Sequence, residues 1–420
     1  MKVFKFGGAS INSVERIQNV AQIPKYRAPE KILVIISAMG KTTNALEKVV
    51  EAFFAGNKEE ALQLFEPVKQ QHLLIAKNVL DTHYLLCEKQ LKDFFTEVEW
   101  LLHDKPVRDY DYYYDQVVCA GELLSTAIVS AYLNEAGVRN KWLDVRDIFR
   151  TDNDFRDATI DWEYTKERVQ RIVIPELDQN GIVLTQGFIG ATDENESTTL
   201  GREGSDYSAA VFANMLDAES LTIWKDVEAV MNADPRQFPD AQCIAELNYN
   251  EVIEMAYYGA QVIHPKTIKP LENKKIPLFV KCFLNPSLPG TVIHNKPVNS
   301  LPPIIVLKEK QVMLEMSSKD FSFVGEQHVG HLYNLFEKLH IKPNLTQNGA
   351  ISFLCVLDDR ADKIEKLALE ASTFLDVQVI KRLSLLTIRH YTKEIFEKLT
   401  EGKTVLLRQQ TPETIQLLLQ

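Results

Sequence analysis

Residues 32–36 read Ile-Leu-Val-Ile-Ile, and this unbroken apolar run constrains the fold more than any other segment. A strand with one face in water alternates apolar and polar residues, whereas a strand covered on both faces of a parallel sheet is apolar throughout. Pro24 and Pro29 separate the run from a preceding helical pattern. The segment 31–37 therefore predicts a buried strand in a central parallel sheet.

Strands and helices alternate along the first half of the chain. Residues 2–6 predict a strand, followed by a turn and by a helix that Ser13 would cap. Further strands are predicted at 182–185 and 221–224. This alternation indicates an α/β domain.

Two stretches in this half are helical. Residues 44–104 are rich in Glu, Lys, Leu and Gln, hold little Gly or Pro, and show helical periodicity. We interpret them as a helical insertion carried on the sheet. Residues 114–135 predict one further helix, ended by Gly137.

Prolines and glycines gather at residues 285–303, a composition typical of a linker. Beyond it the pattern predicts, in chain order, a strand at 311–316, a helix at 329–339, a strand at 350–357, a helix at 361–374, a strand at 378–388, a helix at 393–399 and strands at 404–409 and 414–419. A β-α-β-β-α-β order of this size suits a small ferredoxin-like regulatory module.

The 420 residues carry a formal net charge of −11, which disfavours nucleic acid and anionic lipid as partners. No run approaches the roughly 20 apolar residues of a membrane helix, and the N-terminal stretch is too charged for a signal peptide. The five cysteines include no Cys-x-x-Cys pair, and the His328–His331 pair lacks carboxylates. We therefore expect a cytoplasmic protein without a metal site, a nucleic-acid partner or a membrane.

The first predicted strand ends in Lys5-Phe6-Gly7-Gly8. Two glycines let a phosphate approach the backbone N–H groups closely, and Lys5 adds a cation. Sites in open α/β sheets lie beyond the carboxyl ends of the strands, where this turn falls, although an ordinary turn is the alternative. Gly40-Lys41-Thr42 resembles the end of a P-loop, but the required glycine is replaced by Ile35.

A second segment, 198–210, places Arg202 between glycines and starts a helix at Ser205 or Asp206. A helix N-terminus favours an anion, although either residue could simply cap the helix. A third segment ends a strand in Lys225-Asp226 and carries Arg236 in a turn, and a fourth, 259–265, turns into a helix or strand.

Together these segments resemble the aspartokinases of the amino-acid kinase fold. The matching motifs, in order, are KFGGAS, SAMGKTTN, CAGELLS, TQGFIG, TTLGREGSDYSAA, IWKDVEAVMNADPR and GAQVIHP. Other kinases of acetylglutamate, glutamate and uridylate share the fold, but the GREGSD loop, the GE helix and the C-terminal module point to aspartokinase. The resemblance implies an amino-acid kinase domain over 1–300, with its helical insertion at about 44–115, and an ACT-like region over 309–420 whose second module is abbreviated.

The resemblance also implies a reaction and a set of site residues. ATP, with Mg²⁺, would phosphorylate the β-carboxylate of L-aspartate, the first step toward lysine, threonine and methionine. Lys5 would stabilise the transferring phosphates and Asp206 would orient Lys5. The residues implied to bind substrate are Ala38, Thr43, Glu122, Arg202 and Ser205, and those implied to bind ATP are Lys5, Phe6, Gly7, Gly8, Lys225, Asp226, Met231, Arg236 and Gln261. Pairing between ACT-like modules would give a homodimer.

Several positions depart from the family pattern. Glu203 replaces a glycine and should point away from an anion pocket, and Met231 replaces a tyrosine. Gln261 replaces a lysine at an ATP-contacting position, while Lys225 replaces a threonine, and our hypothesis is a compensating exchange of one cation. The turn at 347–350 lacks the carboxylate that lysine-regulated members use, so weak or absent inhibition by lysine is expected.

Two alternatives stay open at this point. One is a kinase of another amino acid, such as glutamate. The other is an amino-acid-binding regulator built on an inactive kinase scaffold, which the changes at Glu203 and Gln261 would favour and the presence of Lys5, Arg202, Asp206 and Arg236 disfavours.

Overall fold

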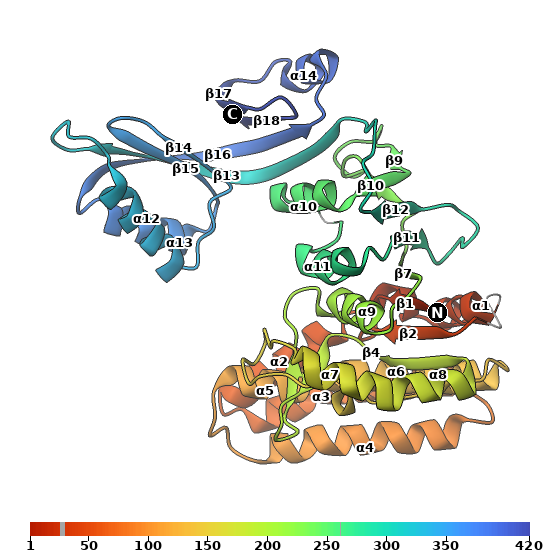
Figure 1. Cartoon of the computed structure of the whole chain (residues 1–420). Helices are drawn as coiled ribbons and strands as arrows, with labels where there is room; N and C mark the ends of the chain where they lie inside the picture. The colour runs from red at the N-terminus through yellow and green to blue at the C-terminus, as the bar shows by residue number, and fades with distance from the viewer. Residues whose placement is uncertain (26–29, 261) are drawn as a thin grey trace. The chain divides into compact units, whose positions relative to one another are not determined.

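The computed structural model describes residues 1–25, 30–260 and 262–420. They divide into two compact units (Figure 1). The first unit consists of residues 1–230, 243–253 and 262–298, and the second of residues 231–242, 254–260 and 299–420. Each unit is described by itself.

An eight-stranded sheet forms the centre of the first unit, in the order β10-β12-β11-β7-β1-β2-β4-β3. Neighbouring strands are parallel except β11 and β12. The strands are β1 (Lys2–Phe6), β2 (Ile32–Ile36), β3 (Lys141–Trp142), β4 (Ile182–Gln186), β7 (Ser220–Lys225), β10 (Glu246–Asn248), β11 (Leu278–Cys282) and β12 (Thr291–His294). The predicted parallel α/β sheet is confirmed.

Helices cover both faces of this sheet, and every residue of β2 and β4 is therefore buried. The helix α6 packs on β2, β3 and β4, and α9 packs on β1, β2 and β7. The helices of the first unit outside the insertion are α1 (Val14–Lys25), α6 (Ala120–Glu135), α7 (Trp162–Arg168), α8 (Ile174–Asn180), α9 (Gly204–Met215) and α11 (Pro265–Lys274), while α10 (Tyr249–Tyr258) begins in the first unit and ends in the second. Ser13 caps α1 as predicted, since its Oγ accepts a hydrogen bond from the Arg16 N–H at 3.3 Å.

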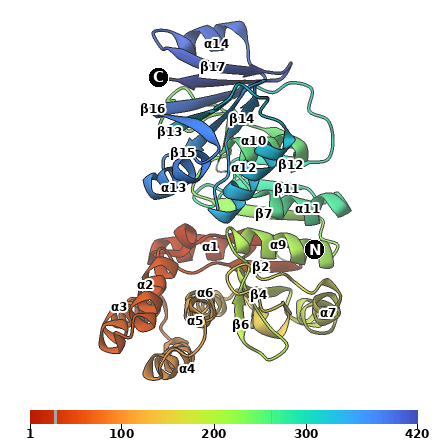
Figure 2. The same ribbon diagram turned by 90° about the vertical axis from the view of Figure 1, so that its left-hand side faces the viewer.

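The predicted helical insertion consists of consecutive helices that pack beside α6 (Figure 2). They are α2 (Thr42–Phe54), α3 (Lys58–Val79), α4 (Tyr84–His103) and α5 (Tyr110–Val118). The helix predicted over 114–135 is confirmed as the run of α5 and α6, which are separated only at Cys119, where the backbone keeps helical dihedrals (φ −53°, ψ −29°). Among the described residues, 110–135 is the one helical stretch long and apolar enough to cross a membrane, but 83% of its most apolar window is buried in the unit.

Shorter elements complete this part of the chain. They are η1 (Gly8–Ile11), η2 (Val145–Asp147), the π-helical turn η3 (Val169–Val173), and the strands β5 (Ile189–Ala191), β6 (Ser197–Thr199), β8 (Val230–Met231) and β9 (Cys243–Ile244). β5 and β6 form an antiparallel pair.

The second unit contains an antiparallel six-stranded sheet in the order β14-β15-β13-β16-β18-β17. Its elements are β13 (Ile304–Ser318), α12 (Glu326–Lys338), β14 (Leu345–Asn348), β15 (Ser352–Asp358), α13 (Ala361–Ala371), β16 (Leu375–Arg389), α14 (Lys393–Thr400), β17 (Val405–Gln410) and β18 (Thr414–Leu419). The β-α-β-β-α-β order from β13 to β16 is the ferredoxin-like arrangement expected of an ACT-like module. The short strand β14 was not predicted. The long strands β13 and β16 pair with each other, and β16 also pairs with β18, which pairs with β17.

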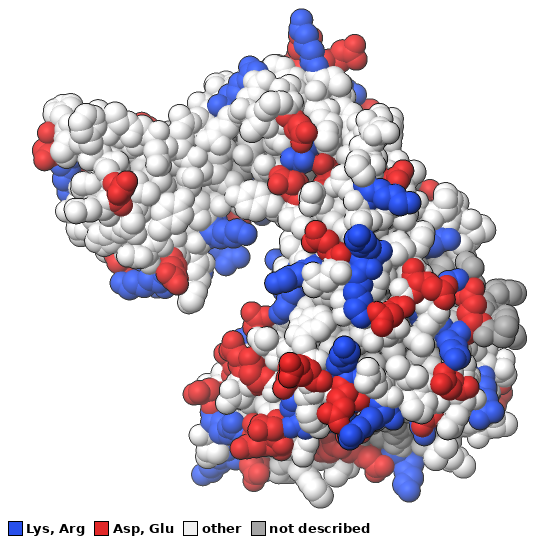
Figure 3. Space-filling model, viewed as in Figure 1, with Lys and Arg blue, Asp and Glu red and all other residues white. Residues whose placement is uncertain are grey.

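Acidic and basic side chains are interspersed over the part of the first unit that faces the viewer in Figure 3. On that face the two signs alternate rather than separating into fields of one charge. The absence of a nucleic-acid partner stays a prediction.

Candidate active site

The candidate site lies where parallel strands of the first unit end side by side. Phe6 pairs in register with Ile36 on one side and with Trp224 on the other, and Ile36 pairs with Gln186. Beyond these residues, the Ser37 N–H donates to the Phe6 carbonyl at 3.2 Å, and the Gly187 N–H donates to the Ile36 carbonyl at 3.1 Å. The loops after β1, β2, β4 and β7 therefore start from one edge of the sheet, as the sequence predicted.

The glycine turn after β1 lies against the loop after β2. A Cβ on Gly8 would stand 2.3 Å from the Ala38 carbonyl oxygen, so no larger residue fits there. The Gly40 N–H also donates to the Gly8 carbonyl at 3.0 Å. A Cβ on Gly7 would stand 3.6 Å from Lys5 Nζ, which places the ammonium beside the turn. Bare backbone and a cation thus share this edge.

Lys5 forms a buried ion pair with Asp206 in the first turn of α9. Lys5 Nζ lies 2.6 Å from Asp206 Oδ1, and the two side chains are only 11% and 8% exposed. Burial by itself would raise the pKa of Asp206, but the positive charges of Lys5 and then Lys225 outweigh burial and lower it. The predicted orientation of Lys5 by Asp206 therefore has its geometric basis.

Lys225 contributes a second cation near Asp206 from the end of β7. Its Nζ donates a hydrogen bond to the Val262 carbonyl at 2.8 Å. Among the described residues this backbone carbonyl is the hydrogen-bond acceptor for Lys225 Nζ. Lys225 therefore ties the end of β7 to the residues that precede α11.

Glu122 brings a buried carboxylate to the loop after β2. One oxygen, Oε1, accepts a hydrogen bond from the Ala38 N–H at 3.1 Å, and no described residue bonds Oε2. The approach depends on Gly121, because a Cβ there would stand 3.0 Å from the Ala38 side chain. Burial raises the pKa of Glu122 to about 8. The Glu122 carboxyl is therefore protonated at neutral pH, and a bound cation would replace that proton.

The loop before α9 carries Arg202 and Glu203. Arg202 is exposed, and among the described residues its guanidinium has no ion-pair partner. Glu203 has a left-handed backbone with φ 55° and stands at the N-cap of α9, so the alternative that Ser205 or Asp206 caps this helix does not hold. The Glu203 carboxylate accepts a hydrogen bond from the His264 N–H at 3.0 Å, which holds it toward the start of α11. Arg202 is thus left available for a ligand.

Asp115 of α5 is a positioning residue that the sequence analysis missed. Its carboxylate accepts hydrogen bonds from the Thr199 N–H at 2.8 Å, the Thr199 hydroxyl at 2.7 Å and the Arg156 N–H at 3.0 Å. Burial raises the pKa of Asp115 to about 6. Because Thr199 lies three residues before Arg202, Asp115 fixes the start of the loop that carries Arg202. The signal in the sequence is an acid within a strongly apolar helical stretch.

Comparison with known proteins decides the family of this site. Residues 1–282 match the Amino acid kinase family. Aspartokinase 2, chloroplastic, of Arabidopsis thaliana is 31% identical over 92% of this chain and 73% of its own length, and lysine-sensitive aspartokinase 3 of Escherichia coli is 30% identical over 92% and 86%. The chain belongs to the aspartokinases of the amino acid kinase family.

Solved aspartokinase structures agree with this assignment. Escherichia coli aspartokinase III in complex with lysine and aspartate superposes with a TM-score of 0.83 at 27% identity, covering 100% of this chain and 95% of that one. The same enzyme with aspartate and ADP gives 0.80, covering 100% and 96%. Some relatives are longer, and the chain spans 32% of a bifunctional aspartokinase/homoserine dehydrogenase of Arabidopsis thaliana.

The remaining expected site residues of this aspartokinase are placed as follows. Ala38 and Ser205 are buried and Thr43 is half-buried in the first turn of α2, while Asp226 is exposed directly after β7. The Phe6 ring is fully buried and stacks on Trp224, so only its backbone can face a nucleotide. Met231 and Arg236 belong to the second unit, where the Arg236 guanidinium is 82% exposed and pairs with Asp234 at 2.7 Å. Gln261 lies outside the described residues.

We expect aspartate binding to release a proton from Glu122. With a pKa of about 8 before aspartate binds, the carboxyl must ionise to accept the substrate ammonium, so affinity should rise about tenfold per pH unit between pH 6 and 8 and then level off. Calorimetry in buffers of different ionisation enthalpy measures the proton count directly. Glu122→Gln should remove the proton release and weaken binding, whereas release that persists in this variant would assign the proton to another group.

Proposed function

We propose that this aspartokinase transfers the γ-phosphoryl group of ATP to the β-carboxylate of L-aspartate, giving 4-phospho-L-aspartate and ADP. The observation that carries the proposal is the buried Lys5–Asp206 ion pair at the glycine turn, in the same unit as a Glu122 oxygen and an Arg202 guanidinium that have no partner among the described residues. This set offers a cation for phosphate and both charges that a substrate amino acid requires. The product would enter the synthesis of lysine, threonine and methionine.

The proposed transfer requires little covalent assistance from the protein. The aspartate β-carboxylate is ionised at pH 7, so no general base is needed for its attack on the γ-phosphorus. A new oxygen–phosphorus bond forms while the bond to the ADP oxygen breaks, and charge spreads over the phosphoryl oxygens. Lys5 and the N–H groups of Gly7 and Gly8 would stabilise that charge, and the proximity of Lys5 Nζ to Gly7 supports this role. The ion pair with Asp206 would hold the Lys5 ammonium beside the glycine turn.

Substrate recognition divides between two elements in this proposal. Glu122 of α6 would accept hydrogen bonds from the α-ammonium, and Arg202 would hold the α-carboxylate through its planar pair of donors. The side-chain carboxylate is then left to point toward Lys5. Specificity for aspartate over glutamate would follow from the fixed distance between these anchors and the transferring phosphate.

Mg²⁺ would enter with the nucleotide. Among the described residues no group of three or more His, Cys, Asp or Glu side chains could hold a metal ion. This fits Mg²⁺, which usually takes most of its ligands from substrate phosphates and water. When bound it would supply positive charge to the phosphates.

Assembly, location and regulation also remain proposals. We infer a kinase domain over 1–300 and an ACT-like region over 309–420 through which two chains would pair, supported by the edge strand β17 with its exposed Val405 and Leu406. A cytoplasmic location stays a prediction, since some relatives are named chloroplastic. Lysine should inhibit weakly or not at all, because the hairpin at 347–350 offers no carboxylate.

A coupled ADP-release assay across the amino acids tests the proposed function. Turnover with aspartate and little with glutamate would support it. Preference for glutamate would make the protein a kinase of that amino acid. ATP binding without ADP release under any amino acid would favour the inactive regulator, the second candidate.

Arg202→Ala should abolish useful aspartate turnover while leaving ATP binding largely intact. Losing a charge-assisted bidentate contact should lower kcat/KM for aspartate about 30-fold to 1000-fold. Arg171→Ala is the matched control, because Arg171 is 71% exposed and pairs only with Glu167 among the described residues. Unchanged KM and kcat in Arg202→Ala would remove Arg202 from the site.

Lys225→Thr should lower kcat about 100-fold if Lys225 supplies the phosphate charge that Gln261 lacks. The positive charge of Lys225 lowers the pKa of Asp206. Lys225 Nζ also donates a hydrogen bond to Val262, the residue that follows Gln261 in the sequence. Adding Gln261→Lys should restore much of the rate, because residues that share one role are non-additive. Near-normal kcat in the single variant, or no rescue in the double one, would show that the two positions act independently.

A further inference from the structure

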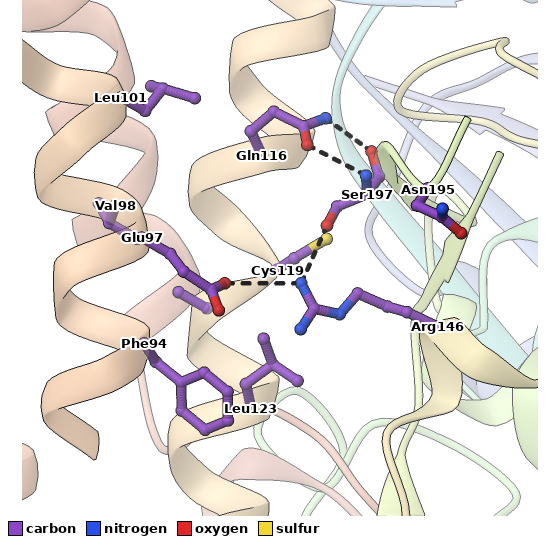
Figure 4. A pocket seen from close by; sticks show the side chains of 11 residues that line it. Phe94, Glu97, Val98, Leu101, Gln116, Cys119, Leu123, Arg146, Asn195 and Ser197 are labelled. Atoms are coloured by element: carbon purple, nitrogen blue, oxygen red, sulfur yellow. Dashed lines mark hydrogen bonds and ion pairs between the residues drawn. The ribbon is translucent and has the colours of Figure 1, made fainter. Parts of the chain in front are cut away.

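A cavity of about 220 Å³ lies in the first unit between α4, the start of α6 and the turn before β6 (Figure 4). Its apolar wall comes from Phe94, Val98 and Leu101 of α4 and from Ala120 and Leu123 of α6. Its polar wall comes from Arg146 of η2 with Glu97, Gln116, Asn195 and Ser197. None of these residues belongs to the proposed aspartate or ATP sites.

Arg146 reaches this cavity with one loosely held nitrogen. Asp144 engages the Nε and Nη2 face, with Nε at 3.1 Å from both carboxylate oxygens and Nη2 at 2.7 Å from Oδ2. Among the residues that the structure describes, Nη1 has only the Ser197 hydroxyl at 3.4 Å and the Glu97 carboxylate at 3.8 Å. Figure 4 shows the guanidinium directed toward Glu97, with Phe94 and Leu123 beside it. A carboxylate could therefore bind Nη1 without breaking the contact with Asp144.

The charges at the cavity favour a ligand that carries both signs. Arg146 is positive, while Asp144 and the half-exposed Glu97 are negative, so a simple anion would meet a net negative surrounding. A simple cation could pair with Glu97, but it would give Arg146 Nη1 no partner closer than those it already has. The Asn195 amide, which has no hydrogen bond to any described residue, adds a neutral donor and acceptor at the rim. Burial raises the pKa of Cys119 well above its usual range, so the neighbouring thiol adds no charge.

We propose that this cavity binds a small zwitterionic amino acid with an apolar side chain. The carboxylate would bind Arg146 Nη1, the ammonium would bind Glu97, and the side chain would lie against Leu123 and Val98. The volume suits a ligand of this size and is below that of typical drug-sized pockets, roughly 300–1,000 Å³.

A ligand here would contact both elements that lead to the proposed substrate groups. Ala120 and Leu123 flank Glu122 on α6, and Ser197 begins β6, which continues through Thr199 toward Arg202. Gln116 and Asp115 of α5 already hold β6 by hydrogen bonds. Binding itself does not depend on the proposed kinase activity, although an effect on turnover would rest on it.

Calorimetry with three related probes tests the ligand class. L-leucine carries both charges, 4-methylpentanoate lacks the ammonium and 3-methylbutylamine lacks the carboxylate. Leucine should bind, and the affinity of each analogue should be lower by about tenfold or more, because each analogue loses one charge-assisted contact. No binding of leucine, valine, isoleucine or methionine, or equal binding of the analogues, would overturn the proposal.

Variants then test the place of binding. Glu97→Gln and Leu101→Trp, which remove the ammonium partner and fill the rim, should each weaken leucine binding about tenfold or more. Glu88→Gln is the control on the same helix, because Glu88 pairs with Lys92 and does not line the cavity. Leucine binding should also persist in Arg202→Ala and with saturating aspartate. Competition by aspartate, or full binding in both cavity variants, would place leucine at another site and contradict the proposal.

Discussion

The ion pair between Lys5 and Asp206 links the first strand to the first turn of α9 at the edge where the candidate site forms. Two buried charges are costly unless they stay paired, so each group fixes the other. Lys5 cannot move away from Asp206 without leaving a buried carboxylate alone, and α9 cannot shift without moving the loop that carries Arg202. The positions of the glycine turn, the substrate loop and α9 are therefore coupled through one contact.

Close contacts of Gly8 and Gly121 with the loop after β2 are the second constraint on this end of the sheet. Gly8 and Gly121 each stand where a Cβ would collide with the loop after β2. The first allows bare N–H groups beside Lys5, and the second brings the Glu122 carboxylate to the Ala38 N–H. The partly desolvated Glu122 is the consequence, with a pKa raised to about 8 and one oxygen without a partner among the described residues. A raised pKa of this kind is typical of a buried group that binds a charged substrate.

Much of this architecture could be predicted from local pattern, and the exceptions have physical causes. The unbroken apolar run of β2 and the glycines after β1 can each be recognised from a few consecutive residues. β14 does not, because Leu-Thr-Gln-Asn has no clear alternation and depends on pairing with β15. The role of Asp115 could not be predicted either, because its partners lie 41 and 84 residues away in the sequence. Glu203 stands at the N-cap of α9 with a left-handed backbone, and its carboxylate accepts a hydrogen bond from His264, 61 residues away in the sequence.

The most direct test of phosphoryl transfer to aspartate is trapping of the product with hydroxylamine. An acyl phosphate reacts with hydroxylamine to give a hydroxamate and free phosphate, whereas simple ATP hydrolysis gives none. With ATP, Mg²⁺ and aspartate, the protein should form aspartyl β-hydroxamate in an amount equal to the ADP released. ADP formation without hydroxamate, or hydroxamate formed from glutamate and not from aspartate, would contradict the account.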